Sequence, residues 1–159
     1  MRLWMLAMVL AACGGGGSTE EETVAAFQAA LDDARALVTS HGQAVHAATT
    51  LEDAGVLEED YVVDWQDMHD QMQERMDDVE GCGMNGDMSS MMDDATEMMG
   101  QLDDDVTSHV HEHDAHTDVA QCRDAETSHA GTMADGLDRM SSDGDAWADS
   151  GMMSCGSIM

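Results

Sequence analysis

Apolar residues recur at steps of three and four along four stretches of the chain, which is the spacing of one face of an α-helix. The first face runs from Val24 to Ala48, the second from Val62 to Val79, the third from Met88 to His116 and the fourth from Val119 to Met140. The chain contains no proline, so no residue lacking a backbone N–H interrupts these stretches. The pattern therefore predicts four long helices.

The ends of the helices are predicted at residues with capping or turn chemistry. Ser18 and Glu21 form a capping-box pattern, in which each side chain accepts a hydrogen bond from the other residue's backbone N–H. Glycine favours turns, and aspartate favours the first position of a helix. On these grounds the later turns, starts and stops are assigned to Gly55, Gly81-Cys82-Gly83, Asp118 and Gly144.

Four helices with short connections pack most economically as an antiparallel up-down-up-down bundle made of two helical hairpins, an all-α fold. The composition agrees with this fold class. Aromatic residues make up only 3% of the 159 residues, while methionine occurs 17 times. Such a chain favours an adaptable core of Met, Val, Leu and Ala over a small β-rich domain. The bundle is predicted to span residues 18–144, followed by a tail at 145–159.

A short repeat suggests how the two hairpins are related. The string VTSH occurs at residues 38–41 and again at 106–109. A second pair of segments, 64–69 and 124–129, starts with aspartate and ends with histidine in both copies. We interpret these matches as a duplicated hairpin, with VTSH on each outgoing helix and Gln/Glu-x-x-His on each returning helix.

The repeat brings histidines together if each turn lies midway between the histidines of its hairpin. A turn at Gly55 places His41 level with His69, and a turn near residue 119 places His109 level with His129. An unpaired buried polar group costs about 1–3 kcal/mol, so four buried imidazoles need a shared partner. That partner is a transition metal, a haem held by two of the histidines, or a hydrated polar layer. The candidate metal ligands are His41, His69, His109, His129 and, one layer further along, Glu126 and His113.

The motifs Gln66-x-x-His69 and Glu126-x-x-His129 resemble the Glu-x-x-His motifs of ferritin-like di-iron bundles. The resemblance implies a metal site in the core. The chain departs from that family because the VTSH histidines stand where bridging carboxylates are expected, and Gln66 replaces a glutamate. This donor set favours Zn, Cu or Ni over a di-iron centre. The alternative is that the histidines of residues 109–116 form an exposed metal-sequestering tract.

The first residues carry a different signal. One arginine and a short apolar run lead to Leu10-Ala11-Ala12-Cys13, which closely resembles the lipobox of bacterial lipoproteins. The resemblance implies that residues 1–12 are a signal peptide, that the thiol of Cys13 carries a diacyl lipid, and that the new amino terminus is acylated, for example with palmitate. Residues 13–17 then form a glycine-rich tether. Gly14 stands where some bacteria place an aspartate that retains lipoproteins in the inner membrane, so an outer-membrane protein facing the periplasm or cell surface is expected.

In such an oxidising compartment the three other cysteines can form a disulfide. Cys82 lies in the loop after the second helix, at the end of the bundle to which the tail can return, so Cys82–Cys155 is the predicted pair. Cys122 begins the fourth helix at the opposite end, roughly 30 Å away by helix rise, and is predicted to be free. The methionines near residues 68–76 and 88–99 are either soft ligands for Cu(I) or core residues.

Charge limits the partners. The 34 acidic residues against five basic ones give a net charge of −29, which excludes nucleic acid and disfavours electrostatic docking to an anionic membrane. No nucleophile–base pair, phosphate loop or Cys-x-x-Cys-His haem motif is visible, so no enzymatic activity is predicted. The sequence favours a lipid-anchored protein that binds a transition metal, Zn or Cu, for buffering, sensing or delivery. The alternative is a structural or interaction lipoprotein whose polar layer only sets helix register.

Overall fold

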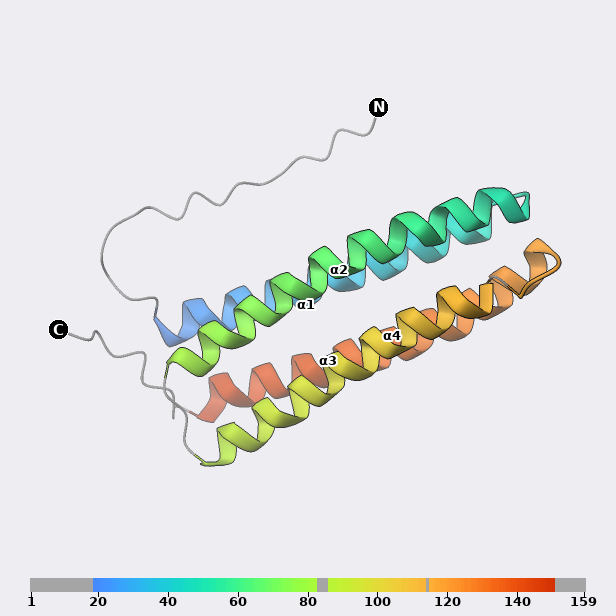
Figure 1. The fold of residues 1–159 in the computed structure, drawn as a ribbon. Helices are drawn as coiled ribbons and strands as arrows, with labels where there is room; N and C mark the ends of the chain where they lie inside the picture. The colour runs from blue at the N-terminus through green and yellow to red at the C-terminus, as the bar shows by residue number, and fades with distance from the viewer. Residues whose placement is uncertain (1–18, 83–85, 114, 151–159) are drawn as a thin grey trace.

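The computed structural model describes residues 19–82, 86–113 and 115–150, and these form four α-helices: α1 (Glu20–Ala47), α2 (Leu51–Gly81), α3 (Gly86–His113) and α4 (Val119–Ser150). The helices run alternately up and down, and the α1–α2 and α3–α4 turns lie at the same end of the bundle (Figure 1). The predicted all-α, antiparallel four-helix bundle made of two hairpins is confirmed.

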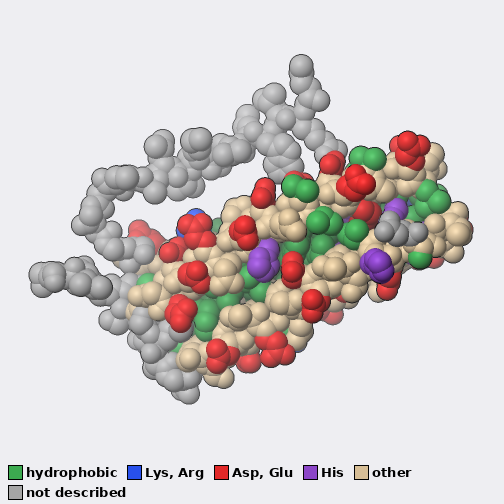
Figure 2. Space-filling view, in the orientation of Figure 1, with side chains coloured by type: hydrophobic (Ala, Val, Ile, Leu, Met, Phe, Trp, Pro, Cys, Tyr) green, Lys and Arg blue, Asp and Glu red, His purple; other side chains and the backbone are tan. Residues whose placement is uncertain are grey.

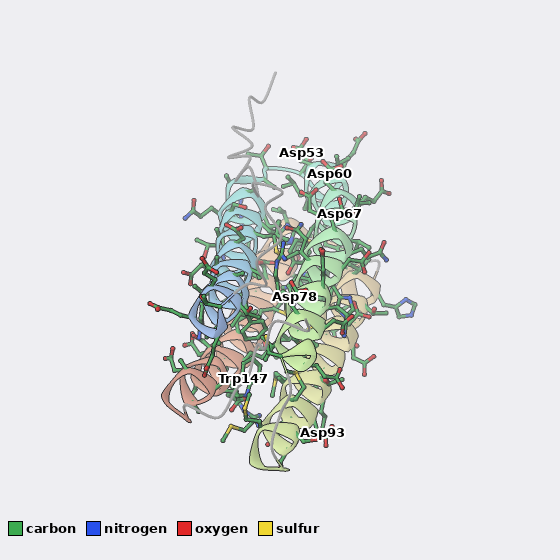
Figure 3. The ribbon with its side chains drawn as sticks, turned by 90° about the vertical axis from the view of Figure 1, so that its left-hand side faces the viewer. Asp53, Asp60, Asp67, Asp78, Asp93 and Trp147 are labelled. Carbon is green, nitrogen blue, oxygen red and sulfur yellow. The ribbon has the colours of Figure 1, made fainter. Side chains whose placement is uncertain are left out.

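The helices occupy the corners of a square. α1 packs against α2 and α4, and α3 packs against α4 and, over a smaller interface, α2. Viewed along the bundle in Figure 3, α1 and α2 form one layer and α3 and α4 form the other. α1 and α3 are therefore diagonal, as are α2 and α4, so an inward-pointing side chain from each helix reaches the same central axis.

The start of α1 follows the predicted capping chemistry, shifted by one position. The Thr19 hydroxyl accepts a hydrogen bond from the Glu22 backbone N at 3.2 Å, and the Glu22 carboxylate accepts one from the Thr19 backbone N at 2.9 Å. The capping box is thus Thr19–Glu22 rather than Ser18–Glu21, and Ser18 lies outside the described residues. Both pairs have the i, i+3 spacing that the motif requires, so the predicted pair differs from the observed one by a single position.

The first turn differs more from its prediction. α2 begins at Leu51, because the Thr50 hydroxyl accepts a hydrogen bond from the Asp53 backbone N at 3.1 Å and caps the helix there. Gly55, the predicted turn, lies inside α2. A glycine within a helix costs only about 1 kcal/mol relative to alanine, so it does not force a turn when a good N-cap stands nearby.

The second hairpin starts its returning helix where predicted. Asp118 Oδ1 accepts hydrogen bonds from the backbone N of Ala120 at 2.9 Å and of Gln121 at 3.1 Å. α4 then continues to Ser150, so the predicted end at Gly144 and the tail boundary at residue 145 are wrong. Gly144 serves close packing instead, because a Cβ there would lie 2.6 Å from Nε2 of Gln28.

The two hairpins repeat with a single sequence offset, which equals the separation between the two VTSH strings. This offset holds for both helices of each hairpin. Each buried hydrophobic position of α1 from Val24 to Val45 has a buried counterpart on α3 at this offset. On the returning helices the same offset matches buried positions of α2 with buried positions of α4, and the shorter offset between segments 64–69 and 124–129 is wrong. The matched pairs include Phe27 with Ala95, Leu31 with Met99, Val38 with Val106, Trp65 with Met133, Met72 with Met140 and Val79 with Trp147. The matching burial supports the interpretation of a repeated hairpin.

The core below the turns is hydrophobic and rich in methionine. Met72, Met76, Met88, Met92 and Met99 are buried among Leu, Val and aromatic side chains. This placement supports core packing for these residues, and copper binding by thioethers stays a prediction. Acidic side chains spread over both hairpins on the face shown in Figure 2. In the part of the chain that the structure describes, no helix is both long and apolar enough to cross a membrane.

Two cysteines lie within the described residues. Cys82 is disulfide-bonded, and Cys122 is free and buried. Cys155 lies outside the described residues, so the pair Cys82–Cys155 stays a prediction. The lipobox, Cys13 and the glycine-rich tether lie outside them as well.

Candidate metal centre

One side chain from each helix contributes to a buried cluster near the turn end of the bundle. The four are His41 from α1, Glu58 from α2, His109 from α3 and Glu126 from α4. Each offers one ligand atom, and these four atoms all lie within 4.8 Å of one another. The residues are 6%, 2%, 5% and 1% exposed in that order. The cluster is therefore a closed polar layer inside the bundle.

The positions of the two turns explain why these residues meet. In each hairpin the glutamate follows the VTSH histidine at the same distance along the sequence, His41 to Glu58 and His109 to Glu126. The midpoints fall at positions 49–50 and 117–118, which are the turns capped by Thr50 and Asp118. Two residues equally far from an antiparallel turn lie level along the helix axis. The repeat of the hairpin then builds the same half-site twice.

The four histidine–glutamate separations within the cluster are those expected between neighbouring ligands of a single ion. His41 Nε2 lies 3.3 Å from Glu58 Oε2 and 3.2 Å from Glu126 Oε2, and His109 Nε2 lies 3.3 Å and 3.1 Å from the same two atoms. A tetrahedral ion with bonds of about 2.0 Å separates its ligand atoms by about 3.3 Å. All of these atoms are buried, and none has a hydrogen-bond partner of good geometry. The same is true of the second carboxylate oxygens, so each glutamate can bind through one oxygen or both.

The cluster is also electrostatically balanced in the absence of an ion. Burial raises the pKa of Glu58, but its contacts with His109 and His41 outweigh this and hold the pKa at about 2. The pKa of Glu126 is lowered for the same reason. Burial lowers the pKa of His109, yet Glu126 and Glu58 raise it to about 9, and that of His41 is raised as well. When both histidines are protonated, two imidazolium and two carboxylate groups sum to zero charge.

An aromatic ring covers each histidine of the cluster from its own hairpin. The Tyr61 ring stacks on His41 with centroids 4.0 Å apart, and the His129 ring stacks on His109 at 4.2 Å. Tyr61 and His129 are equivalent positions of the repeated hairpin, and each stands one helical turn after its glutamate. The repeated motif of the returning helices is therefore Glu-x-x-Tyr in α2 and Glu-x-x-His in α4.

Hydrogen bonds fix the orientation of His129. Its Nδ1 lies 2.7 Å from Asp105 Oδ2, and its Nε2 lies 3.1 Å from the Tyr61 hydroxyl. Burial and the positive charge of His109 lower the pKa of His129, which favours the neutral ring. Because a carboxylate only accepts, Nδ1 donates to Asp105 and Nε2 accepts from Tyr61. Both ring nitrogens of His129 thus have hydrogen-bond partners, and its ring packs against His109 at the side of the cluster.

The structure brings together some of the residues that the sequence singled out as ligands. His41, His109 and Glu126 belong to the cluster, and His129 contacts it through ring stacking. His69 does not belong to it. It lies about three helical turns beyond Glu58 on α2, roughly 16 Å along the helix. Its side chain is 29% exposed, and its Nδ1 is 3.8 Å from Asp70. The misplaced turn at Gly55 accounts for this error.

His113 also lies outside the group of four. It is buried one turn beyond His109, and its ring centroid is 5.7 Å from that of His116. Because His109 and His113 are both buried, the segment 109–116 is not an exposed metal-sequestering tract as a whole.

Glu58 is the residue of the cluster that the sequence pattern did not single out. The signal was present, because a glutamate follows the histidine of each VTSH string at the same distance along the chain. Gly42 also has a role that its sequence neighbours did not indicate. A Cβ at this position would lie 2.9 Å from Glu126 Oε1, so glycine leaves room for the carboxylate against α1.

Comparisons of the chain with family models, with curated proteins and with solved structures find no match. The resemblances to bacterial lipoproteins and to ferritin-like bundles therefore stay expectations.

Proposed function

We propose that the bundle binds one divalent transition-metal ion, Zn²⁺ in the first instance, through His41, Glu58, His109 and Glu126. The observation that supports this most directly is the set of four Nε2–Oε2 separations, which lie between 3.1 and 3.3 Å. The atoms concerned are buried and have no hydrogen-bond partner of good geometry. Imidazole nitrogen and carboxylate oxygen are both common zinc ligands. Cu²⁺ is the second candidate, because imidazole ranks among its preferred ligands.

The proposed role is to hold the ion for buffering, sensing or delivery rather than to turn over a substrate. The ligand atoms are enclosed by four helices and by the rings of Tyr61 and His129. We further propose that a lipid on Cys13 anchors the bundle to a membrane in an oxidising compartment. Partition of the full-length chain into a detergent phase, lost in a Cys13→Ser variant, is the measurement that tests this anchor.

The direct test is the metal content of the purified full-length chain, followed by thermal unfolding with Zn²⁺ and with a chelator. We expect about one ion per chain after loading and a higher melting temperature with Zn²⁺, since a ligand that binds only the folded state stabilises it. The alternative role is a structural one, favoured by the charge balance of the cluster without an ion. No bound Zn²⁺ or Cu²⁺, together with a melting temperature indifferent to both, would establish that alternative.

Gly42 offers a test of the geometry that changes no ligand. A Gly42→Ala variant is expected to bind Zn²⁺ on the order of ten-fold more weakly. Substitutions of residues that contact and orient metal ligands have effects of this size. The added methyl group displaces the Glu126 carboxylate from its contacts with the two histidines. Titration of Zn²⁺ against a competing chelator measures the change.

The matched control is Gly131→Ala on α4, where a Cβ would meet no other group within 4 Å. That exposed helical position is expected to gain roughly 0.5–1 kcal/mol of stability with unchanged Zn²⁺ affinity. Equal affinities in both variants would show that the Glu126 position is not essential to binding.

A further inference from the structure

A furrow along the first hairpin is lined in part by His41 of the candidate metal centre. A depression of about 540 Å³ lies between α1 and α2, and a second of about 560 Å³ adjoins it toward the turn. Ala44 and Leu57 line both, so the two depressions adjoin each other. The α1 side is formed mainly by small residues, among them Ser40, Ala44 and Ala47.

Acidic residues and one candidate ligand, His41, line the furrow. Asp60 and Asp64 on α2 line the first depression, together with His41 and Tyr61. Glu52 and Asp53 line the second depression, which lies nearer the turn. Figure 3 shows Asp53 and Asp60 on the side of α2 that faces away from α3 and α4. His41 thus lines the furrow, while its buried Nε2 belongs to the cluster.

The second hairpin is built differently at the equivalent positions, although its cluster residues repeat. The counterpart of Leu37 is Asp105, which is committed to His129 at 2.7 Å, and the counterpart of Ala44 is the longer Glu112. The counterparts of Asp60 and Asp64 are Ser128 and Thr132, which carry no charge. At these positions the acidic residues therefore lie on α2 in the first hairpin and on α3 in the second, where Asp105 is committed to His129 and the longer Glu112 replaces the small Ala44.

We propose that the furrow is the route by which a hydrated divalent cation enters and leaves the centre, with Asp60 and Asp64 as a transient capture site and His41 as the ligand that passes the ion inward. This inference rests on the proposed metal binding and adds its route. Carboxylates attract a hydrated cation without removing all its water. His41 lines the furrow, and its Nε2 lies 3.3 Å from Glu58 and 3.2 Å from Glu126, so rotation of its ring, with displacement of Tyr61, carries the ion across.

The first experiment measures the association rate of Co²⁺, followed by its visible absorbance in stopped flow, with the full-length chain. A variant with Asp60→Asn and Asp64→Asn is expected to bind on the order of ten-fold more slowly at low ionic strength, and the difference should shrink with added salt. The matched control is Asp103→Asn with Asp104→Asn, which removes the same charge from an exposed segment of α3. The control should bind at the wild-type rate.

The second experiment fills the furrow instead of changing its charge. Ala44→Leu is expected to slow association and release of Co²⁺ by the same factor and so leave the equilibrium affinity unchanged. Ala36→Leu, on an exposed position of α1 outside the furrow, is its control. Release is measured by transfer of the ion to an excess of chelator.

The outcomes separate this proposal from the metal site itself. Wild-type affinity with wild-type rates in both furrow variants would overturn the route and leave the metal centre standing. An Ala44→Leu variant whose affinity falls while its association rate is unchanged would also overturn it. If the wild-type chain binds no Co²⁺ or Zn²⁺ at all, the metal centre fails and the route fails with it.

Discussion

Replacing Glu58 with glutamine is expected to remove most of the stabilisation that Zn²⁺ gives to the bundle. At a free Zn²⁺ concentration about 1,000 times the dissociation constant, the wild-type chain should gain about 4 kcal/mol in its free energy of unfolding. The amide keeps the shape of the side chain but loses the negative charge opposite His41 and His109, which lie 3.3 Å from the carboxylate. We expect affinity to fall at least about 100-fold, which removes about 2.7 kcal/mol of that gain.

The measurement is the difference in unfolding free energy with Zn²⁺ and with chelator for each variant, so that any loss of stability in the metal-free protein cancels. Glu59→Gln removes the same charge from an exposed neighbour on α2 and should respond to Zn²⁺ like the wild type. His69→Gln should do the same, because His69 lies away from the cluster. A full Zn²⁺ response in Glu58→Gln, or a lost one in His69→Gln, would contradict the assigned ligand set.

The metal-free bundle is expected to lose stability as the pH rises from about 6.5 to 9. The folded pKa of His109 is about 9, above its ordinary value of 6.5, so its protonated form is stabilised by folding. That contribution is fully present below pH 6.5 and lost as pH passes the folded pKa. Glu58 behaves in the opposite sense. Its pKa falls from 4.5 to about 2, so its contribution is present above pH 4.5 and lost as the pH falls toward 2.

Zn²⁺ should reverse the loss of stability that the metal-free bundle shows as the pH rises. The ion competes with protons for Nε2 of His41 and His109, so binding releases protons and strengthens as the pH rises. Chemical unfolding at a series of pH values, with chelator and with Zn²⁺, measures both curves. A His109→Gln variant should show a weaker fall between pH 6.5 and 9. A metal-free wild-type curve that stays flat over this range would contradict the paired imidazolium groups.

The size of the error on α2 shows how sensitive the site is to the turn. Along an antiparallel hairpin, a turn misplaced by one position moves the level partner by two positions. Moving the turn from Gly55 to the Thr50 cap changes the partner of His41 from His69 to Glu58, a shift of about three helical turns. The sequence predicts the second turn near Asp118, where the structure has it, and His129 accordingly lies close to the cluster.

Periodicity within each helix was enough to predict four helices, their alternating directions and the inward placement of His41, His109 and Glu126. These features depend on the helical repeat of about 3.6 residues per turn and on short connections, both of which are local properties of the chain. Contacts between helices decided the rest of the site. They join the two glutamates to the two histidines, exclude His69, and stack Tyr61 and His129 on the histidines of the cluster. The turn positions follow from local capping hydrogen bonds such as that between Thr50 and Asp53, but the meeting of side chains from four helices depends on how the packed surfaces fit together, which no single stretch of residues encodes.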